Sequence, residues 1–220
     1  MPRALLSAAS KMEIEAKFTI PDANVARRLR SLTRCGAFTL TAPQTLRVRD
    51  TFFDSSTRAL RATRHVLRVR FRSDGKTFIT LKAPTQKNGA LHRRPEIEVP
   101  VVLTRVPKIL TRANLPARIY KLIAQKINDA PLRPLFSISQ TRHVRVLKNG
   151  RRIIGEWSVD RVEFRAGARR HAFYELEVEL KKSGTEQELA EFIATLQKQI
   201  QLEPQRAGKF ERALTFYQAT

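Results

Sequence analysis

The sequence predicts an α+β domain that is mainly β, with antiparallel strands and with helices packed outside the sheet. Three observations support this fold class. Short stretches that alternate charged with apolar residues recur along the chain, as at residues 11–18, and such alternation is typical of strands with two different faces. Asp74-Gly75 and Asn149-Gly150 each separate two alternating stretches, which is a strong β-hairpin signal. The regular exchange of strands and helices that marks parallel sheets is not found.

The alternation defines about eight strands. They are expected at residues 11–20, 44–53, 66–72, 77–83, 91–99, 136–148, 151–162 and 170–181. Each of these stretches is bounded by turn residues, a helical stretch or a proline. Several strands carry charged residues on one face, some acidic and others rich in arginine. This combination favours a barrel with a charged interior.

Helices are expected between and after the strands. Apolar periodicity places them at 22–34, at 104–128 and at 206–218, with a turn or short helix at 54–60. The second of these is interrupted at Pro116, because proline cannot continue a helix. Thr185 and Glu188 have the spacing of a capping box, which predicts that a further helix begins there.

Composition limits the classes of partner. The chain has 220 residues, and 42 Lys and Arg against 20 Asp and Glu give a formal net charge of +22. We therefore expect an anionic substrate or partner. A general affinity for nucleic acid would also follow from this charge, but no zinc-finger, homeodomain or RNP-type motif accompanies it. One domain is predicted over residues 11–220, after a loose extension at residues 1–10.

Cysteine usage and hydropathy indicate the compartment. Cys35 is the only cysteine, so an intramolecular disulfide is excluded, which fits a reducing environment. No apolar stretch approaches the roughly 20 residues that a membrane-spanning helix needs. The sequence therefore predicts a cytoplasmic protein without a membrane partner. Its oligomeric state stays open, a homodimer included.

The charged faces of the strands form a set. They carry Glu13, Glu15 and Lys17; Arg68 and Arg70; Lys82; Arg94, Glu96 and Glu98; Glu156 and Asp160; and Glu175, Glu177 and Glu179. Carboxylates packed together repel one another unless a cation neutralises them, and Mg²⁺ or Mn²⁺ prefers oxygen ligands. Arginine in turn binds phosphate oxygens through its planar fork. The set predicts a site that processes a polyphosphate.

Other catalytic classes find no support in the sequence. Cys35 has no histidine near it in sequence, and the four histidines lack metal-ligand spacing. The Walker A, G-x-G-x-x-G and G-x-S-x-G motifs are not found.

The motifs resemble those of a known family. Glu13-Ile-Glu15-Ala-Lys17 is similar to the E-x-E-x-K signature of the CYTH, or triphosphate tunnel metalloenzyme, superfamily. It is followed in order by Leu67-Arg68-Val69-Arg70, Thr80-Leu81-Lys82, Arg94-Pro95-Glu96, Asp160, Glu175-Leu176-Glu177 and Lys209-Phe-Glu-Arg212. The resemblance covers residues 11–217 and is greatest to the bacterial inorganic triphosphatase branch, here without the helical CHAD domain.

The resemblance implies a fold, a reaction and roles. The fold would be an eight-stranded antiparallel β-barrel tunnel. Metal would be bound by Glu13, Glu15, Asp160 and two of Glu175, Glu177 and Glu179. The phosphates would be held by Lys17, Arg68, Arg70, Lys82, Arg94, Arg142, Lys209 and Arg212. Glu13, Glu15, Lys17, Lys82 and Glu177 would be catalytic. Simple alternation groups Arg142 with Val144, so that a β-bulge is expected to turn Arg142 inward.

The implied reaction is attack of water on a terminal phosphorus of tripolyphosphate, with Mg²⁺ or Mn²⁺, to give phosphate and pyrophosphate. One alternative is a nucleotide- or thiamine-triphosphate-directed member, such as a class IV adenylate cyclase or a thiamine triphosphatase. This class needs a surface at the tunnel mouth that recognises the organic group, and the sequence shows no aromatic cluster for one. A non-catalytic module that binds polyphosphate or RNA is another alternative. A purely structural barrel is disfavoured, because a charged interior lowers stability. The excess exterior charge indicates some non-specific binding of polyanions.

Overall fold

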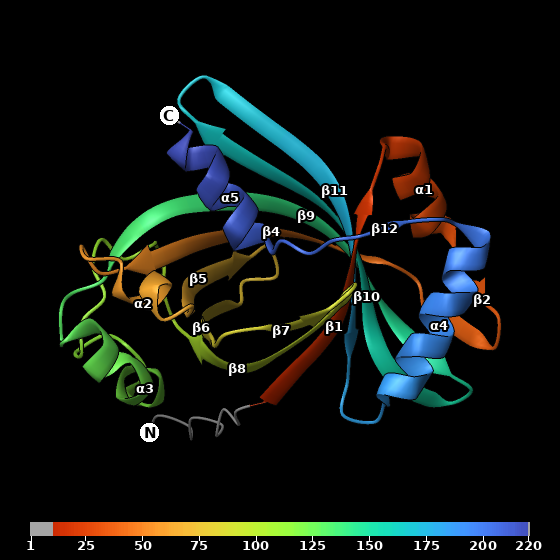
Figure 1. Ribbon diagram of the computed structural model, residues 1–220, viewed down its shortest axis with the longest axis horizontal. Helices are drawn as coiled ribbons and strands as arrows, with labels where there is room; N and C mark the ends of the chain where they lie inside the picture. The colour runs from red at the N-terminus through yellow and green to blue at the C-terminus, as the bar shows by residue number, and fades with distance from the viewer. Residues whose placement is uncertain (1–10, 220) are drawn as a thin grey trace.

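Eight antiparallel strands close into a barrel in the computed structural model, which describes residues 11–219 (Figure 1). In chain order they are β1 (Lys11–Ile20), β4 (Gln44–Asp54), β5 (Val66–Arg72), β6 (Thr77–Lys82), β8 (Leu91–Val101), β9 (Arg133–Asn149), β10 (Arg152–Ala166) and β11 (Arg169–Leu180). Around the barrel the order is β10, β11, β1, β8, β6, β5, β4 and β9, and β9 pairs again with β10. The predicted fold class is confirmed. The predicted extension at residues 1–10 lies outside the described residues.

Shorter elements surround the barrel. Four short strands are β2 (Arg34–Cys35), β3 (Phe38–Leu40), β7 (Gln86–Asn88) and β12 (Glu203–Pro204), and the helices are α1 (Ala23–Ser31), α2 (Ala59–Ala62), α3 (Ala117–Ile127), α4 (Glu186–Gln199) and α5 (Lys209–Gln218). β12 pairs with β1, and β7 pairs with β8. None of the helices in residues 11–219 is long and apolar enough to cross a membrane.

The two predicted hairpin turns are confirmed. Gly75 lies between β5 and β6 with φ of 80°, and Gly150 lies between β9 and β10 with φ of 57°. Both turns need the left-handed conformation that glycine adopts without steric cost. They fix the register of the strand pairs, and register determines which side chains face the interior.

Alternation along β1 places its charged residues inside and its apolar residues outside. Ala16 and Phe18 are buried in a core that lies between the outer face of the barrel and helices α1 and α4. Trp157 of β10 and Phe192 of α4 meet edge to face in this core. A second apolar core packs the outer faces of β5, β6 and β8 against α3. The helices therefore shield the outside, and the charged faces point inward.

Helix α5 lies across one end of the barrel (Figure 1). Its Phe210 packs against Phe52 of β4 and Phe136 of β9, and its Ala213 is fully buried with Val162 of β10. These barrel residues lie on the faces that point inward. The last helix of the chain therefore covers the interior at this end.

Two predicted helices are shorter than expected. The helix predicted at 22–34 ends at Ser31, because Leu32 has an extended backbone and residues 34–35 form β2, which pairs with β3. The helix predicted at 104–128 exists only from Ala117, so its first part is wrong. Pro107 has no amide hydrogen and disfavours helical backbone before it, and Pro116 marks the N-terminus of the helix that does form.

The capping box of α4 generates a stability prediction. The Thr185 side chain accepts a hydrogen bond from the amide of Glu188, and the Glu188 carboxylate accepts one from the amide of Thr185. We expect Thr185→Ala to lower the free energy of unfolding by about 1 kcal/mol, because a helix amide loses its partner. Urea titration followed by circular dichroism measures this, with exposed Gln187→Ala as the control. Equal stability of the two variants would contradict the prediction.

Candidate active site

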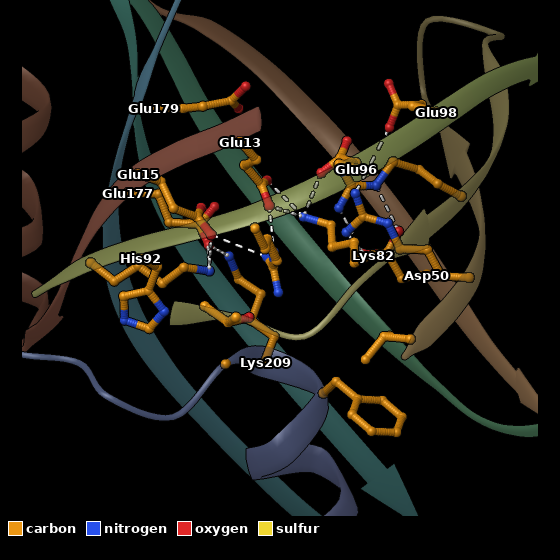
Figure 2. A pocket seen from close by; sticks show the side chains of 18 of the residues that line it. Glu13, Glu15, Asp50, Lys82, His92, Glu96, Glu98, Glu177, Glu179 and Lys209 are labelled. Atoms are coloured by element: carbon orange, nitrogen blue, oxygen red, sulfur yellow. Dashed lines mark hydrogen bonds and ion pairs between the residues drawn. The ribbon is translucent and has the colours of Figure 1, made fainter. Parts of the chain in front are cut away.

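The barrel encloses a cavity of about 640 Å³. Eleven of the fourteen residues predicted from the sequence line it: Glu13, Glu15, Lys17, Arg68, Arg70, Lys82, Arg94, Arg142, Glu177, Glu179 and Lys209. They come from β1, β5, β6, β8, β9, β11 and α5. Figure 2 labels six of them: Glu13, Glu15, Lys82, Glu177, Glu179 and Lys209. Asp160, Glu175 and Arg212 do not line the cavity. The structure thus brings together most of the predicted set.

Glu13 is at the centre of one charged group. It faces Arg94 across the β1–β8 pair, and its two carboxylate oxygens accept hydrogen bonds of 2.7 and 2.9 Å from Nζ of Lys82. Burial alone would raise the pKa of Glu13, but Lys82, Arg94 and Lys17 together hold it well below its usual range. Nζ of Lys82 also lies 2.9 Å from Glu96. Glu13 is therefore ionised, and its charge is compensated on two sides.

Lys17 connects β1 to β11. It stands opposite Glu177 in the register, and its Nζ lies 2.9 Å from Glu177 and 3.1 Å from Glu15. Burial and the nearby charges of Glu13 and Glu177 raise the pKa of Glu15, although Lys17 and Arg94 oppose this. Burial would also raise the pKa of Glu177, but Lys17, Lys209 and Arg142 hold it well below its usual range. Two neighbouring carboxyl groups thus differ in their affinity for a proton.

Lys209 reaches from α5 into the barrel and meets three carboxylates. Its Nζ lies 2.8 Å from Asp160, 3.0 Å from Glu175 and 2.8 Å from Glu177. Asp160 and Glu175 are fully buried. Both carboxylate oxygens of Glu175 lack a hydrogen bond, because the contact with Lys209 has the distance of an ion pair but not hydrogen-bond geometry. Burial and Glu177 raise the pKa of Glu175, although Lys209 opposes this. Two predicted metal ligands are therefore in contact with Lys209 and outside the cavity lining.

Arg142 points inward without the predicted bulge. It stands opposite Asp160 in the β9–β10 pair, its Nε lies 3.0 Å from Asp160, and its Nη2 donates a 3.0 Å hydrogen bond to Glu177. The registers of β9 are regular around this position. The expectation of a bulge was wrong, because Val144 itself lines the cavity, so that the strand face shared by Arg142 and Val144 points inward.

Arg212 and Glu179 lie apart from the centre of the site. The guanidinium of Arg212 stacks on the ring of Phe173 at 3.3 Å and lies 3.9 Å from Glu175. Glu179 pairs with Lys11 at 2.8 Å and is separated from Glu15 and Glu177 in Figure 2. Of the three alternating glutamates on β11, Glu177 is the one in the central ion-pair network.

The sequence interpretation missed Asp50. This fully buried carboxylate of β4 accepts hydrogen bonds from Arg70, Arg68 and Gln140. Burial would raise its pKa, but Arg70 and Arg68 hold it well below its usual range. A signal was present in the sequence, because Asp50 is a charged residue that alternates with the apolar Leu46, Val48 and Phe52. The charged face of that strand, with Arg47 and Arg49, is exposed instead.

His92 was also missed. It lines the cavity from β8, and its Nε2 donates a 2.9 Å hydrogen bond to the carbonyl oxygen of Gln205. Burial and the positive charge of Lys17 lower the pKa of His92 to about 4. The imidazole is therefore neutral at pH 7 and adds no charge to the site.

The carboxylates are oxygen ligands of the kind that a hard cation prefers, but they already contact basic groups. As the side chains stand, no three Asp, Glu, His or Cys residues in the described part of the chain form a group that could hold a metal ion. Both carboxylate oxygens of Glu175 nevertheless lack a hydrogen bond. The carboxylates of Glu15, Glu175 and Glu177 also repel one another, so a bound cation would stabilise their ionised forms. The residues fit Mg²⁺ or Mn²⁺ in ligand type, provided that lysine contacts are released.

Comparison with known proteins agrees with the geometry. The CYTH domain matches residues 11–214. The chain is 30% identical over 159 residues to an inorganic triphosphatase of Haemophilus influenzae, a match that covers 72% of this chain and 43% of that protein. The chain therefore spans less than half the length of this relative.

Solved structures share the fold. A Hippeastrum protein, described as a proposed adenylyl cyclase with a dominant triphosphatase activity, superposes with a TM-score of 0.71 at 21% identity, over 93% of this chain and 96% of that one. A proposed adenylate cyclase of Bacillus halodurans superposes with a TM-score of 0.62 at 17% identity, over 92% and 97% of the two chains.

The neutral state of His92 predicts a pH dependence of stability. Because its pKa is about 4 when folded and near 6.5 when unfolded, the unfolded chain binds more protons between these values. The stabilising contribution is present above pH 6.5 and is lost as the pH falls toward 4. We expect His92→Gln to lose less stability than the parent protein over this interval, measured by urea unfolding at stepped pH. Parallel curves for the two proteins would contradict the prediction.

Proposed function

The chain belongs to the CYTH family, and we propose that it hydrolyses tripolyphosphate to pyrophosphate and phosphate inside the barrel. The observation that carries this proposal is the enclosed cavity, in which a carboxylate wall on β1 and β11 faces lysines and arginines of β5, β6, β8, β9 and α5. Basic residues outnumber acidic ones in its lining. The cavity is therefore suited to an anion. The name of the Haemophilus relative supports the same reaction.

The basic side chains would bind and orient the phosphate chain. Lys82, Arg94 and Arg142 each come from a different strand and converge on the cavity. Their charges lie where water is largely excluded, so that they would stabilise the charge that develops on the transferred phosphoryl group more strongly than in solution. Their contacts with Glu13 and Glu177 hold them in place before substrate binds.

The acidic side chains would hold Mg²⁺ or Mn²⁺. Glu13, Glu15 and Glu177 are the candidates on the cavity wall, with Asp160 and Glu175 beside Lys209. The metal, when bound, would neutralise phosphate charge and act as a Lewis acid. Lys17 and Lys209 would have to exchange carboxylate contacts for phosphate contacts.

Glu177 is suited to orient the attacking water. Its low pKa keeps it ionised, so that it accepts a hydrogen bond from water readily but is a weak general base. Glu15, with its raised pKa, has the greater affinity for a proton. Water held by Glu177 would attack the terminal phosphorus, and pyrophosphate would leave.

A second candidate substrate class is favoured by apolar side chains in the cavity lining. Phe52, Phe210 and Leu214 line the cavity together with Arg61 and Arg64. Phe52 and Phe210 belong to a cluster of rings that the sequence alone did not show. Aromatic and apolar side chains next to a phosphate site suit the organic group of a nucleoside triphosphate or of thiamine triphosphate.

Loss of Glu15 provides the main test. We expect Glu15→Gln to lower phosphate release from tripolyphosphate by about 10²–10³-fold, because a buried charge that acts on the metal and on Lys17 is removed. Release is measured with Mg²⁺, with Mn²⁺ and with a chelator, with Glu191→Gln on the exposed face of α4 as the control. Undiminished turnover in the Glu15 variant, or full turnover of the parent protein with chelator, would contradict the proposal.

Loss of Phe210 distinguishes the two substrate classes. If the organic group of ATP packs on this ring, we expect Phe210→Ala to lower kcat/KM for ATP about tenfold while kcat/KM for tripolyphosphate changes less. Thiamine triphosphate is assayed in parallel. An unchanged ratio between the substrates would exclude a role of this ring in recognising the organic group and favour the inorganic substrate.

A further inference from the structure

Asp50 contacts two arginines of the cavity unequally. Nε and Nη2 of Arg70 donate hydrogen bonds of 2.7 Å each to the two oxygens of Asp50, which is the planar fork geometry of a guanidinium on a carboxylate. Arg68 makes one longer contact, 3.3 Å from Nη1. Gln140 of β9 donates a fourth hydrogen bond, of 2.8 Å, to the same carboxylate.

The strand register explains why this contact is rigid. Asp50 stands directly opposite Arg70 in the β4–β5 pair, and Arg68 lies two residues before Arg70 on the same face of β5. The side chain of Asp50 is 1% exposed, whereas the arginines are 12% and 11% exposed toward the cavity. Two guanidinium groups on one face would repel each other without a carboxylate between them.

The donors that remain free belong mainly to Arg68. Its Nε is buried without a hydrogen bond, and its Nη2 is 3.9 Å from Glu98. Arg70 has only Nη1 outside its fork. Because the Arg68 side chain makes one hydrogen bond and is 12% exposed, its guanidinium has donors available for an anion in the cavity.

We propose that Asp50 is a positioning residue that engages Arg70 as a support and so leaves Arg68 as the guanidinium that contacts substrate phosphate. The inference rests on the proposed function and divides the roles of two arginines that the family resemblance treats alike. Asp50 itself touches no phosphate, because its oxygens accept hydrogen bonds from Arg68, Arg70 and Gln140.

The loss of the negative charge of Asp50 and the loss of its positioning role would change the affinity for a polyanion in opposite directions. Asp50→Asn removes one negative charge from the cavity wall, which by Coulomb attraction alone would strengthen the binding of a polyanion. If Asp50 positions the arginines, the same variant weakens binding, because Arg70 loses its fork and the two guanidinium groups separate. The sign of the change distinguishes the two effects.

The experiment measures the affinity of the whole chain for tripolyphosphate by calorimetry, without divalent metal. We expect Asp50→Asn and Arg70→Met to weaken binding about tenfold each. In the second variant Asp50 would form its hydrogen bonds with Arg68 instead, so that Arg68 is no longer available to phosphate. Arg68→Met should weaken it at least as much. The double variant of Asp50 and Arg70 should be no weaker than either single variant, because the two residues act as a unit. In turnover assays, Asp50→Asn should raise KM for tripolyphosphate about tenfold and change kcat less.

Glu163→Gln is a control of the same charge change, since Glu163 also contacts two arginines, Arg161 and Arg165, but at an exposed part of β10. It should leave affinity unchanged. Equal or tighter binding by Asp50→Asn overturns the proposal, and so does a parent protein that binds no tripolyphosphate. If Asp50→Asn does not fold, as judged by circular dichroism, Arg70→Met decides, and unchanged affinity there overturns the proposal. Binding without turnover by the parent protein would contradict the proposed hydrolysis but would leave the affinity test intact.

Discussion

Charge compensation inside a closed barrel is the constraint on which the structure depends. Glu13, Glu15 and Glu177 are withdrawn from bulk water, and removing an ionised carboxylate from water costs several kcal/mol unless an opposite charge replaces the water. The barrel supplies those charges from neighbouring strands, because register sets Glu13 opposite Arg94 and Lys17 opposite Glu177. Apolar alternation on the outer faces, covered by helices, in turn forces the charged faces inward. Fold and site are therefore consequences of one pattern.

The same pattern explains what could be predicted from the sequence. A period of two identifies strands and the side chains that share a face, so that the eight barrel strands and the inward charged residues of β1, β5, β8 and β11 followed directly. It failed where a face is mixed. Asp50 alternates with apolar residues, and it was therefore missed. Arg142 shares its strand face with Val144, and a bulge was therefore expected where there is none. It also failed at 104–116, where two prolines override an apolar periodicity.

Contacts between distant segments could not be derived from local pattern. Lys209 follows the last barrel strand by almost thirty residues, yet its ammonium group meets Asp160, Glu175 and Glu177. Lys209 belongs to α5, which packs through Phe210 on rings from β4 and β9. The position of this helix determines whether a buried carboxylate faces the cavity or is covered. The sequence identified the acidic residues of β11 by alternation, but only the position of α5 separates Glu177 from Glu175.

Ion pairing within the cavity has a thermodynamic consequence for the proposed function. The ammonium groups of Lys17 and Lys209 that neutralise the carboxylates are the groups that a phosphate chain would attract. A phosphate that takes over these lysines would leave Glu15, Glu175 and Glu177 with less compensation and so raise their affinity for a divalent cation. Linkage then requires that the cation raise the affinity for phosphate by the same factor. A network in which basic groups contact the buried carboxylates is thus suited to take up an anion and a cation together.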